Sequence, residues 1–208
     1  FDLKDAIALV QKRGRYMQEA VPEGAGLMAA ILGMDRAAVE KTCLDASKNG
    51  IVAPANYNSP GQIVIAGEKI AVEKAMELAK AAGAKKVVPL AVSVPSHCSL
   101  MKQAGDRLAK ELDRVTINDL RIPIMNNADA KFIRTAAELR PSLLRQISSS
   151  LYWEDSINRL TAEGYDAFVE IGPGKVLSGL VKRIAKDAKV LNVEDQKSMG
   201  ETLSALGL

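Results

Sequence analysis

His97 is the only histidine in the 208 residues, and it follows an apolar segment at positions 87–94. It lies where a predicted strand ends and a helix is predicted to begin, and in open α/β sheets such strand ends are where sites form. A neutral imidazole there can act as a general base. The alternative is a packed or surface histidine in a loop, and position alone does not decide between the two.

Arg13 lies in an apolar row of a predicted helix, between Leu9 and Tyr16. An unpaired buried guanidinium is costly, so this side chain needs an anion. The anion is either a structural carboxylate of the protein or a ligand carboxylate held in bidentate fashion. From the residues alone the structural pair is the more common outcome.

Several side-chain amides stand at places where a polar site could form. Gln146 falls on the apolar side of a predicted helix, where a buried amide must find partners. Asn56, Asn58, Asn126 and Asn127 lie at predicted strand ends, where asparagine also serves ordinary turns. Both interpretations stay open at this point.

Two further motifs match known chemistry only in part. Cys98 adjoins His97, but neighbouring residues that enter a helix project in different directions, which disfavours a thiol nucleophile. The segment Gly172-Pro173-Gly174-Lys175 could hold a phosphate at a helix amino terminus, yet it lacks the spacing of a P-loop. A tight strand-to-helix turn is the simpler interpretation of this segment.

Composition narrows the class of protein. Hydrophobic residues make up 48% and charged residues 25%, which is typical of a soluble globular protein. No apolar run approaches the roughly 18 residues of a membrane span. The only cysteines, Cys43 and Cys98, are too few and too separated for a zinc site or a disulfide framework, so we expect no metal and a reduced, cytoplasmic setting.

The elements that must position these residues begin with a helix over 5–21, which carries Arg13. After the break at 22–26, hydrophobic patterning predicts a β-α-β-β-α-β unit of the ferredoxin-like kind. Its strands are predicted at 27–32, 51–57, 63–66 and 86–94, and its helices at 35–49 and 70–82.

The remainder of the chain alternates helix and strand, which predicts a parallel sheet covered by helices. We therefore predict an α/β core from 1–23 and 92–208, with a ferredoxin-like subdomain inserted at 24–91. The predicted helices of this remainder are 96–112, 136–150, 153–163 and 176–186, and the predicted strands are 122–125, 167–171 and 190–193.

Five segments carry a resemblance to a known family. They are QKRG at 11–14, MQEAVPEG at 17–24, NYNSPGQ at 56–62, VSVPSHC at 92–98 and IGPGKVL at 171–177. Together, and in this order, they resemble the malonyl-CoA:acyl-carrier-protein transacylases of bacterial fatty-acid synthesis, close relatives of polyketide-synthase acyltransferase domains. The resemblance implies a hydrolase-like parallel-sheet core, incomplete here, with an inserted ferredoxin-like subdomain.

The resemblance also implies roles for particular residues. Arg13 matches the arginine that pairs with the malonyl carboxylate, His97 matches the general base, and Gln146 matches the residue whose main-chain carbonyl orients that base. The residues that match substrate-binding positions are Met17, Asn56, Asn58 and Asn127.

The family nucleophile is the serine of a GxSxG elbow, and this motif occurs nowhere in the sequence. In the family the elbow precedes the arginine helix, so we expect it upstream of Phe1, and we expect the isolated chain to be inactive. The implied reaction is ping-pong acyl transfer with no cofactor. Its substrates are malonyl-CoA and the phosphopantetheinylated acyl carrier protein, and a monomer is expected at full length.

The acyl carrier protein of this pathway is strongly acidic, so a basic docking surface is expected on its partner. Two basic pairs, Lys85 with Lys86 and Lys182 with Arg183, are the candidates. Each pair can equally be a solvated charge without a partner.

Three rival functions remain. A methylmalonyl-specific polyketide-type acyltransferase would differ in the residues just before the histidine, here Val94-Pro95-Ser96. A nucleic-acid-binding module would need aromatic residues on its strands and more than a net charge of +3, and the strands at 27–32 and 63–66 have no aromatic residue. A non-catalytic fragment or scaffold is the third.

Overall fold

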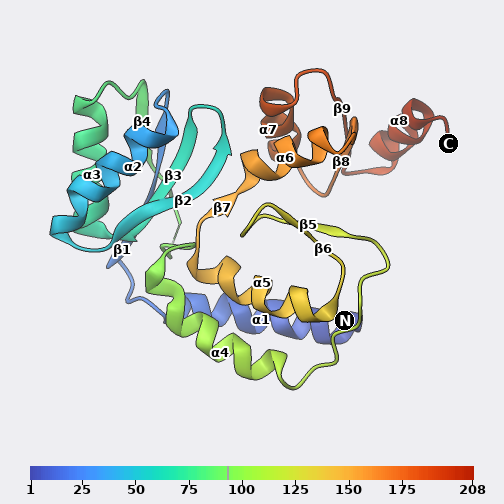
Figure 1. The fold of residues 1–208 in the computed structure, drawn as a ribbon, viewed down its shortest axis with the longest axis horizontal. Helices are drawn as coiled ribbons and strands as arrows, with labels where there is room; N and C mark the ends of the chain where they lie inside the picture. Colours follow the sequence, from blue (N-terminus) through green and yellow to red (C-terminus); the bar gives the residue numbers. More distant parts are fainter. Residues whose placement is uncertain (93) are drawn as a thin grey trace.

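The computed structural model describes residues 1–92 and 94–208, and a five-stranded mixed sheet forms one half of it (Figure 1). Its strands are β1 Gly26–Leu32, β2 Val52–Ser59, β3 Gln62–Glu68, β4 Lys86–Pro89 and β7 Leu151–Tyr152. They stand in the order β4-β1-β3-β2-β7. The first four pair antiparallel, whereas β7 joins the edge of β2 in parallel.

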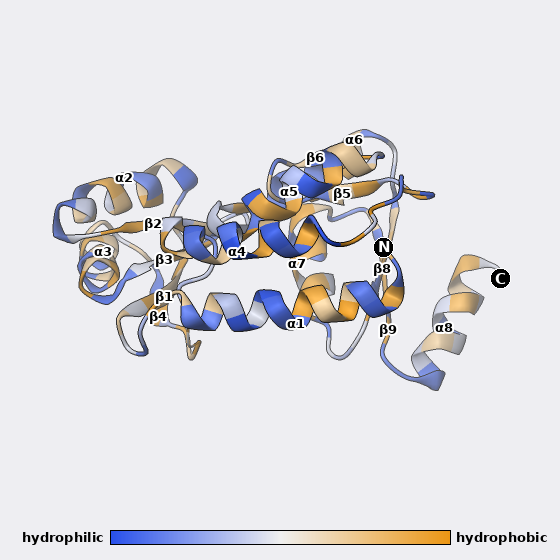
Figure 2. Ribbon diagram, turned by 90° about the horizontal axis from the view of Figure 1, so that it is seen from below, coloured by the Kyte–Doolittle hydropathy of each residue, from blue (hydrophilic) through white to orange (hydrophobic). Residues whose placement is uncertain are grey.

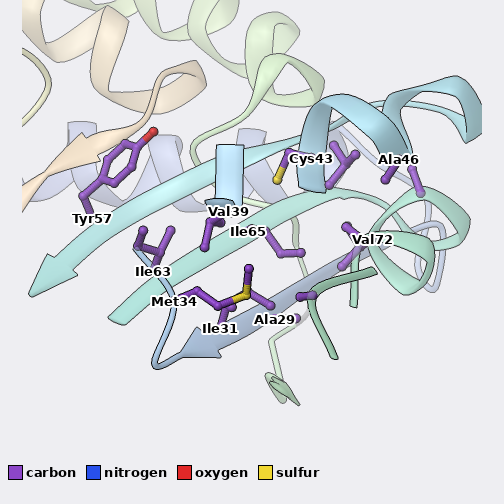
Figure 3. Packing of buried hydrophobic residues seen from close by; sticks show 14 residues of the cluster. Ala29, Ile31, Met34, Val39, Cys43, Ala46, Tyr57, Ile63, Ile65 and Val72 are labelled. Carbon is purple, nitrogen blue, oxygen red and sulfur yellow. The ribbon is translucent and has the colours of Figure 1, made fainter. Parts of the chain in front are cut away.

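Two helices, α2 (Arg36–Ala46) and α3 (Lys69–Ala81), cover one face of this sheet. The carboxylate of Asp35 accepts a hydrogen bond from the Ala38 amide at 2.8 Å, which caps the start of α2. Figure 3 shows side chains of the strands and the two helices meeting in one apolar cluster, whose fully buried members include Ala29, Ile31, Val39, Ile65 and Val72.

This arrangement confirms the predicted β-α-β-β-α-β order and its ferredoxin-like character. The bounds of the subdomain at 24 and 91 stay a prediction. The segment that contains β7 and the start of α6 also contacts this subdomain through aromatic and charged side chains. The ring of Tyr57 stacks on that of Tyr152 with centroids 5.2 Å apart, and Arg36 lies over Tyr57 while it pairs with Asp155 at 2.7 Å.

A second layer consists of three helices, α1 (Leu3–Glu19), α4 (Lys102–Leu112) and α5 (Ala136–Ser148). Helix α4 contacts both of the others, and the three lie side by side in Figure 1. Their shared apolar cluster consists of Leu9, Tyr16, Met17, Met101, Ala104, Leu108, Leu112 and Ile147.

The carboxyl-terminal part contains a short antiparallel hairpin and a parallel pair of strands. The hairpin is β5 (Ile124–Asn126) with β6 (Lys131–Ile133), and the pair is β8 (Ala167–Ile171) with β9 (Lys189–Val193). The helices of this part are α6 Trp153–Ala162, α7 Val176–Ile184 and α8 Gln196–Leu206. Among the described residues the parallel pairing that we predicted for the core is limited to β8 with β9 and β2 with β7.

Several predicted bounds were wrong. The strand predicted at 86–94 ends at Pro89, and its position 93 lies outside the described residues. The helix predicted from residue 96 begins only at Lys102, after a 3-10 turn at Ser99–Met101. Pro95 and a left-handed His97 (φ 61°) cannot continue a right-handed helix.

The strand predicted as buried at 122–125 is a three-residue exposed hairpin strand, in which Ile124 is 47% exposed. On α1 the side chains of Ile7 and Val10 are solvent-exposed, whereas Leu9, Tyr16 and Met17 are buried. The sequence after Val193, for which no element was predicted, forms α8 with Asp195 as its cap. No helix in the described part of the chain is long and apolar enough to cross a membrane.

Candidate active site

His97 lies in the turn between β4 and the 3-10 segment at Ser99–Met101, not at the start of a helix. Its Nδ1 lies 2.7 Å from the main-chain oxygen of Gln146, and its amide donates to the oxygen of Ile147 at 3.2 Å. Both carbonyls belong to the last turns of α5. A carbonyl oxygen only accepts, so Nδ1 carries the proton and Nε2 is the basic nitrogen.

The backbone of His97 is strained, because its φ of 61° lies in the left-handed region. That conformation costs a residue with a Cβ about 1–2 kcal/mol. The neighbouring Pro95 is buried and packs directly on Gly26 of β1, where a Cβ would come within 2.5 Å of its ring. The two hydrogen bonds to α5 and the contact with Gly26 hold the turn, and strain of this kind is typical of functional positions.

The surroundings of His97 favour the neutral imidazole. Burial lowers the pKa of His97, the Gln146 carbonyl raises it, and the positive charge of Arg13 lowers it again. The net result is a pKa below the ordinary value of 6.5. A neutral ring with a free Nε2 is the form that a general base requires near neutral pH.

Arg13 is half-buried on α1 and faces the same end of α5. Its Nη2 donates to the side-chain oxygen of Gln146 at 3.5 Å, the long limit for such a bond. Among the described residues no salt bridge includes Arg13, so the structural carboxylate considered above is not found there. Burial lowers the pKa of Arg13, but an arginine stays charged at neutral pH.

The cleft beside Arg13 has a volume of about 350 Å³ and is largely apolar. Its polar side chains are those of Arg13 and Gln146. An apolar cleft with one half-buried cation and one amide suits a small ligand that ends in a carboxylate. The cleft is lined by Phe1, Ala6, Leu9, Val10, Arg13, Leu108, Leu112, Leu143 and Gln146.

Gln146 connects the two groups. Its main-chain oxygen holds His97, its side-chain oxygen faces Arg13, and its side-chain nitrogen donates to Oδ1 of Asn127 at 3.1 Å. The bond to Asn127 fixes which end of the amide faces Arg13. The main-chain oxygen of Asn127 in turn accepts from the amide of Tyr152 at 2.6 Å, in the strand that joins β2.

The other asparagines have different places. Asn126 forms an ordinary turn, since its Oδ1 accepts from the amides of Ala128 and Asp129 at 2.9 Å. Asn56 pairs with Val64 in β3, which packs with Cys98 on the sheet face away from α2 and α3. Asn56 therefore shares the face that adjoins the His97 turn, whereas Asn58 lies at a register shift between Tyr57 and Ser59, where strict alternation does not apply.

Two further candidate residues are buried, and substrate binding by Met17 stays a prediction. Met17 is 6% exposed and belongs to the α1–α4–α5 core, and it does not line the cleft beside Arg13. Cys98 is buried, its Sγ donates to the Pro95 oxygen at 3.1 Å, and burial raises the pKa of its thiol to about 11. A thiol in that state is a poor nucleophile.

The turn at 172–174 is not a phosphate cradle. The carboxylate of Glu170 accepts from the amides of Leu177 and Ser178 at 3.0 and 2.7 Å, at the start of α7. Glu194 accepts from the amide of Gly174 at 2.9 Å. Two protein carboxylates thus occupy the donors that an anion would use. Glu170 was not among the predicted residues, because it lies in β8, several residues before the start of α7, and not at a cap position.

Basic residues approach one another at one end of the sheet. Nη1 of Arg183 in α7 donates to Oε1 of Gln62 at 2.5 Å. Gln62 is paired with Leu32 in β1, and Leu32 is paired with Lys86 in β4. Since neighbouring strands lie about 4.8 Å apart, the backbones of Gln62 and Lys86 are separated by about 10 Å. Lys85 is exposed beside Lys86 in the sequence, and Lys182 is exposed beside Arg183.

No group of three or more His, Cys, Asp or Glu side chains that could hold a metal ion occurs in the described part of the chain. The chemistry of the site is thus set by one imidazole, one guanidinium and the amide between them. The fold around them is α/β with a mixed sheet, and such a site fits an acyl-transfer enzyme that acts on an acid.

Comparison with known proteins agrees with this class. The family model described as "Acyl transferase domain" matches residues 2–203, and the chain belongs to this family. Malonyl CoA-acyl carrier protein transacylase of Escherichia coli (strain K12) is 48% identical over 202 residues, which are 97% of this chain and 65% of that protein. The protein of the same name from Bacillus subtilis (strain 168) is 46% identical over 98% of this chain and 64% of its own length.

Solved structures show the same fold. An acyl carrier protein S-malonyltransferase from Vibrio cholerae superposes with a TM-score of 0.95 at 46% identity, over 97% of this chain and 66% of that one. A malonyl-transacylase in complex with its type II PKS acyl-carrier protein superposes with a TM-score of 0.96 at 46% identity, over 99% and 66%. The chain thus has the α/β acyltransferase fold and spans about 65% of the length of the curated relatives it matches.

Proposed function

We propose that this chain is the part of a malonyl-CoA:acyl-carrier-protein transacylase that supplies the general base and the malonyl-binding arginine. One observation carries the proposal: Gln146 holds His97 through its main-chain oxygen at 2.7 Å while its side chain reaches Arg13. A base and an unpaired cation are thereby held at one end of one helix. The names of the relatives supply the substrates, malonyl-CoA and the acyl carrier protein.

In the proposed mechanism, Nε2 of His97 takes the proton of the GxSxG serine, whose oxygen attacks the malonyl thioester. The C–S bond breaks, and the CoA thiolate receives that proton from the imidazolium. The phosphopantetheine thiol then gives its proton to His97 and attacks the acyl-serine. The C–O bond to the serine breaks, and the serine oxygen takes that proton back from the imidazolium. Arg13 holds the malonyl carboxylate through both half-reactions. No cofactor takes part in this sequence of steps.

The proposed cellular setting is the reduced cytoplasm, because both cysteines are free and buried in the described structure. We further propose that exposed apolar side chains of the core, such as Ile171 at 82% exposure, contact the segment that carries the serine. The full-length enzyme is a protein in which these 208 residues follow such a segment.

The proposal is tested by the rate of acyl-enzyme formation from labelled malonyl-CoA in full-length enzyme, followed by transfer to the phosphopantetheinylated carrier. His97→Ala should lower acylation by roughly two to four orders of magnitude, the range expected for loss of a general base. Cys98→Ser is the matched control, because a hydroxyl can still donate to the Pro95 oxygen, and it should acylate at the wild-type rate.

Near-normal acylation of His97→Ala would remove histidine from the mechanism. Loss of acylation in Cys98→Ser would point to the thiol instead. A methylmalonyl-specific acyltransferase is the alternative that the residues before His97 raise. Methylmalonyl-CoA is therefore included as a second substrate. A faster reaction with methylmalonyl-CoA would correct the substrate while leaving the mechanism in place.

A further inference from the structure

Glu111, on the face of α4 that meets α1, has a role in none of the steps above. Its Oε2 accepts from Nζ of Lys12 at 2.6 Å, and its Oε1 accepts from the hydroxyl of Tyr16 at 3.0 Å. The Glu111 side chain is only 12% exposed, although it is charged. Each carboxylate oxygen therefore has its own partner on α1, and Nη1 of the exposed Arg114 also lies 3.5 Å from Oε2.

The two partners flank Arg13. Lys12 precedes it and Tyr16 follows it by three residues, so Lys12 and Tyr16 form an i, i+4 pair on one face of α1. Two fixed points on one face determine the rotation of a helix about its axis. At a helix radius of about 5–6 Å, a rotation of only ~10° moves a side chain by about 1 Å. A misplacement of ~1 Å can cost about a hundredfold in rate.

Apolar packing of Leu9, Tyr16 and Met17 also holds α1 against the neighbouring helices, whereas the amino-terminal turns of α1 are less restrained. Leu3, Ile7 and Val10 are 75%, 62% and 69% exposed, and Figure 2 shows apolar colouring along the amino-terminal half of α1. The second ion pair between α1 and α4, Arg107 with Glu19, lies further along the helix, and its side chains are 43% and 47% exposed. Glu111 thus makes the polar contacts that lie closest to Arg13 along α1.

We infer that Glu111 is a positioning residue for Arg13, which sets the rotation of α1 so that the guanidinium meets the carboxylate of the acyl substrate. Glu111 itself touches neither Arg13 nor the substrate. The inference rests on the proposed function and predicts that Glu111 affects the choice between malonyl and acetyl groups. A salt bridge that merely stabilised the fold would lower both rates or neither.

A double-mutant cycle in full-length enzyme separates these roles. Glu111→Lys and Lys12→Glu each place like charges opposite one another, and each should lower the malonyl-to-acetyl ratio of kcat/KM by about tenfold or more. The double variant Lys12→Glu with Glu111→Lys restores the pair with its charges exchanged and should recover most of the ratio. The rate with acetyl-CoA, which has no carboxylate, should change little throughout.

Asp113→Asn is the matched control. Asp113 also lies at the end of α4, but it pairs with Arg140 of α5 and not with α1. Its loss should leave the malonyl-to-acetyl ratio unchanged, even if the melting temperature falls. Hydrogen exchange supplies a second readout in the 208-residue chain itself: Glu111→Gln should speed amide exchange in α1 around Arg13 more than Asp113→Asn does.

An unchanged ratio in both Glu111→Lys and Lys12→Glu, or an equal fall in Asp113→Asn, would overturn the inference and leave the proposed function intact. A wild-type enzyme without any preference for malonyl would overturn the proposed function. In that case the exchange rates still decide whether Glu111 fixes α1, and equal exchange in the two variants would refute that as well.

Discussion

Gln146 makes the base and the cation of the site depend on one residue. Its carbonyl fixes the tautomer and direction of His97, and its side-chain amide, locked by Asn127, faces Arg13. The main-chain contact survives any substitution at this position, whereas the side-chain contact does not. Substitutions of Gln146 should therefore act on carboxylate recognition before they act on proton transfer.

The environment of His97 predicts a pH dependence. Burial first, and the charge of Arg13 second, lower the pKa of His97, against the opposing effect of the Gln146 carbonyl. The neutral base therefore persists to a lower pH than in a free histidine. In full-length enzyme, the acidic limb of kcat/KM for acylation, measured over about pH 5 to 8, should have its midpoint below ~6.5.

The same shift has a consequence for stability. An unfolded chain binds a proton at His97 near the ordinary pKa, while the folded chain resists it, so the unfolded state binds more protons in the window just below ~6.5. The contribution of His97 to stability is complete above that value and is lost as pH falls through the lowered pKa.

A kinetic midpoint at or above 6.5, with Cys98→Ser as the reference variant, would contradict the described environment.

At the scale of single residues, the sequence alone predicted that Arg13 lies among apolar residues, because the spacing places Leu9 and Tyr16 in the same helical row. It did not predict the absence of a protein carboxylate beside Arg13, nor the link from Gln146 to Asn127. The contact between Arg13 and Gln146 joins residues 133 positions apart, and the contact between Gln146 and Asn127 joins residues 19 positions apart. No local pattern in the sequence encodes such separations. Glu111 was also missed, although it lies one turn beyond the buried Leu108 on the same helix.

At the scale of elements, the ferredoxin-like unit was predictable because its signals are local. Asp35 caps α2, and a positive φ at Gly83 follows the end of α3 as the sequence indicates. The strands β6 and β7 were not predicted, since two or three residues show no periodicity. The helix start at 96 failed because the left-handed His97 depends on contacts with α5, which lie outside its own segment.

Lys86 and Arg183, which lie on either side of Gln62, are the predicted binding surface for an acidic carrier. If these cations form the docking surface, Lys86→Glu and Arg183→Glu should each raise the Michaelis constant for the carrier by roughly two- to tenfold. The Michaelis constant for malonyl-CoA should stay constant, and added salt should weaken the difference from wild type. The measurement is steady-state transfer with each substrate varied in turn.

Two controls isolate the effect of charge. Arg183→Gln removes the charge but can still donate to Gln62, so it should have a smaller effect than Arg183→Glu. Lys197→Glu reverses an 85% exposed charge on α8, which Figure 1 places far from the β2–β3 turn, and it should change nothing. Unchanged carrier kinetics in Lys86→Glu and Arg183→Glu would rule out this surface.

At the scale of the molecule, the class of fold was predictable and the extent of the sheet was not. Alternating helices and strands indicate a parallel core, but the described residues contribute only the β8–β9 pair to it, and the apolar Val169 and Ile171 are exposed. Which strands adjoin depends on chain segments distant in sequence. The base and the arginine, by contrast, are held together by α1, α5 and the His97 turn, whose contacts lie within the described residues.

The central claim is that Arg13 recognises the malonyl carboxylate, and its most direct test is a pair of acylation rates in full-length enzyme. Malonyl-CoA and acetyl-CoA are compared in wild type, Arg13→Ala and Arg13→Lys. Loss of one partner of a desolvated charge pair costs about 3–5 kcal/mol, so malonyl transfer should fall roughly a hundredfold or more in Arg13→Ala.

Acetyl-CoA lacks a carboxylate, so its rate should change little and the selectivity should collapse. Arg13→Lys should recover part of the malonyl rate, because an ammonium retains the charge but cannot form the bidentate contact. If both substrates slow by the same factor in Arg13→Ala, then Arg13 serves the fold, and the assignment of malonyl as the transferred group is contradicted.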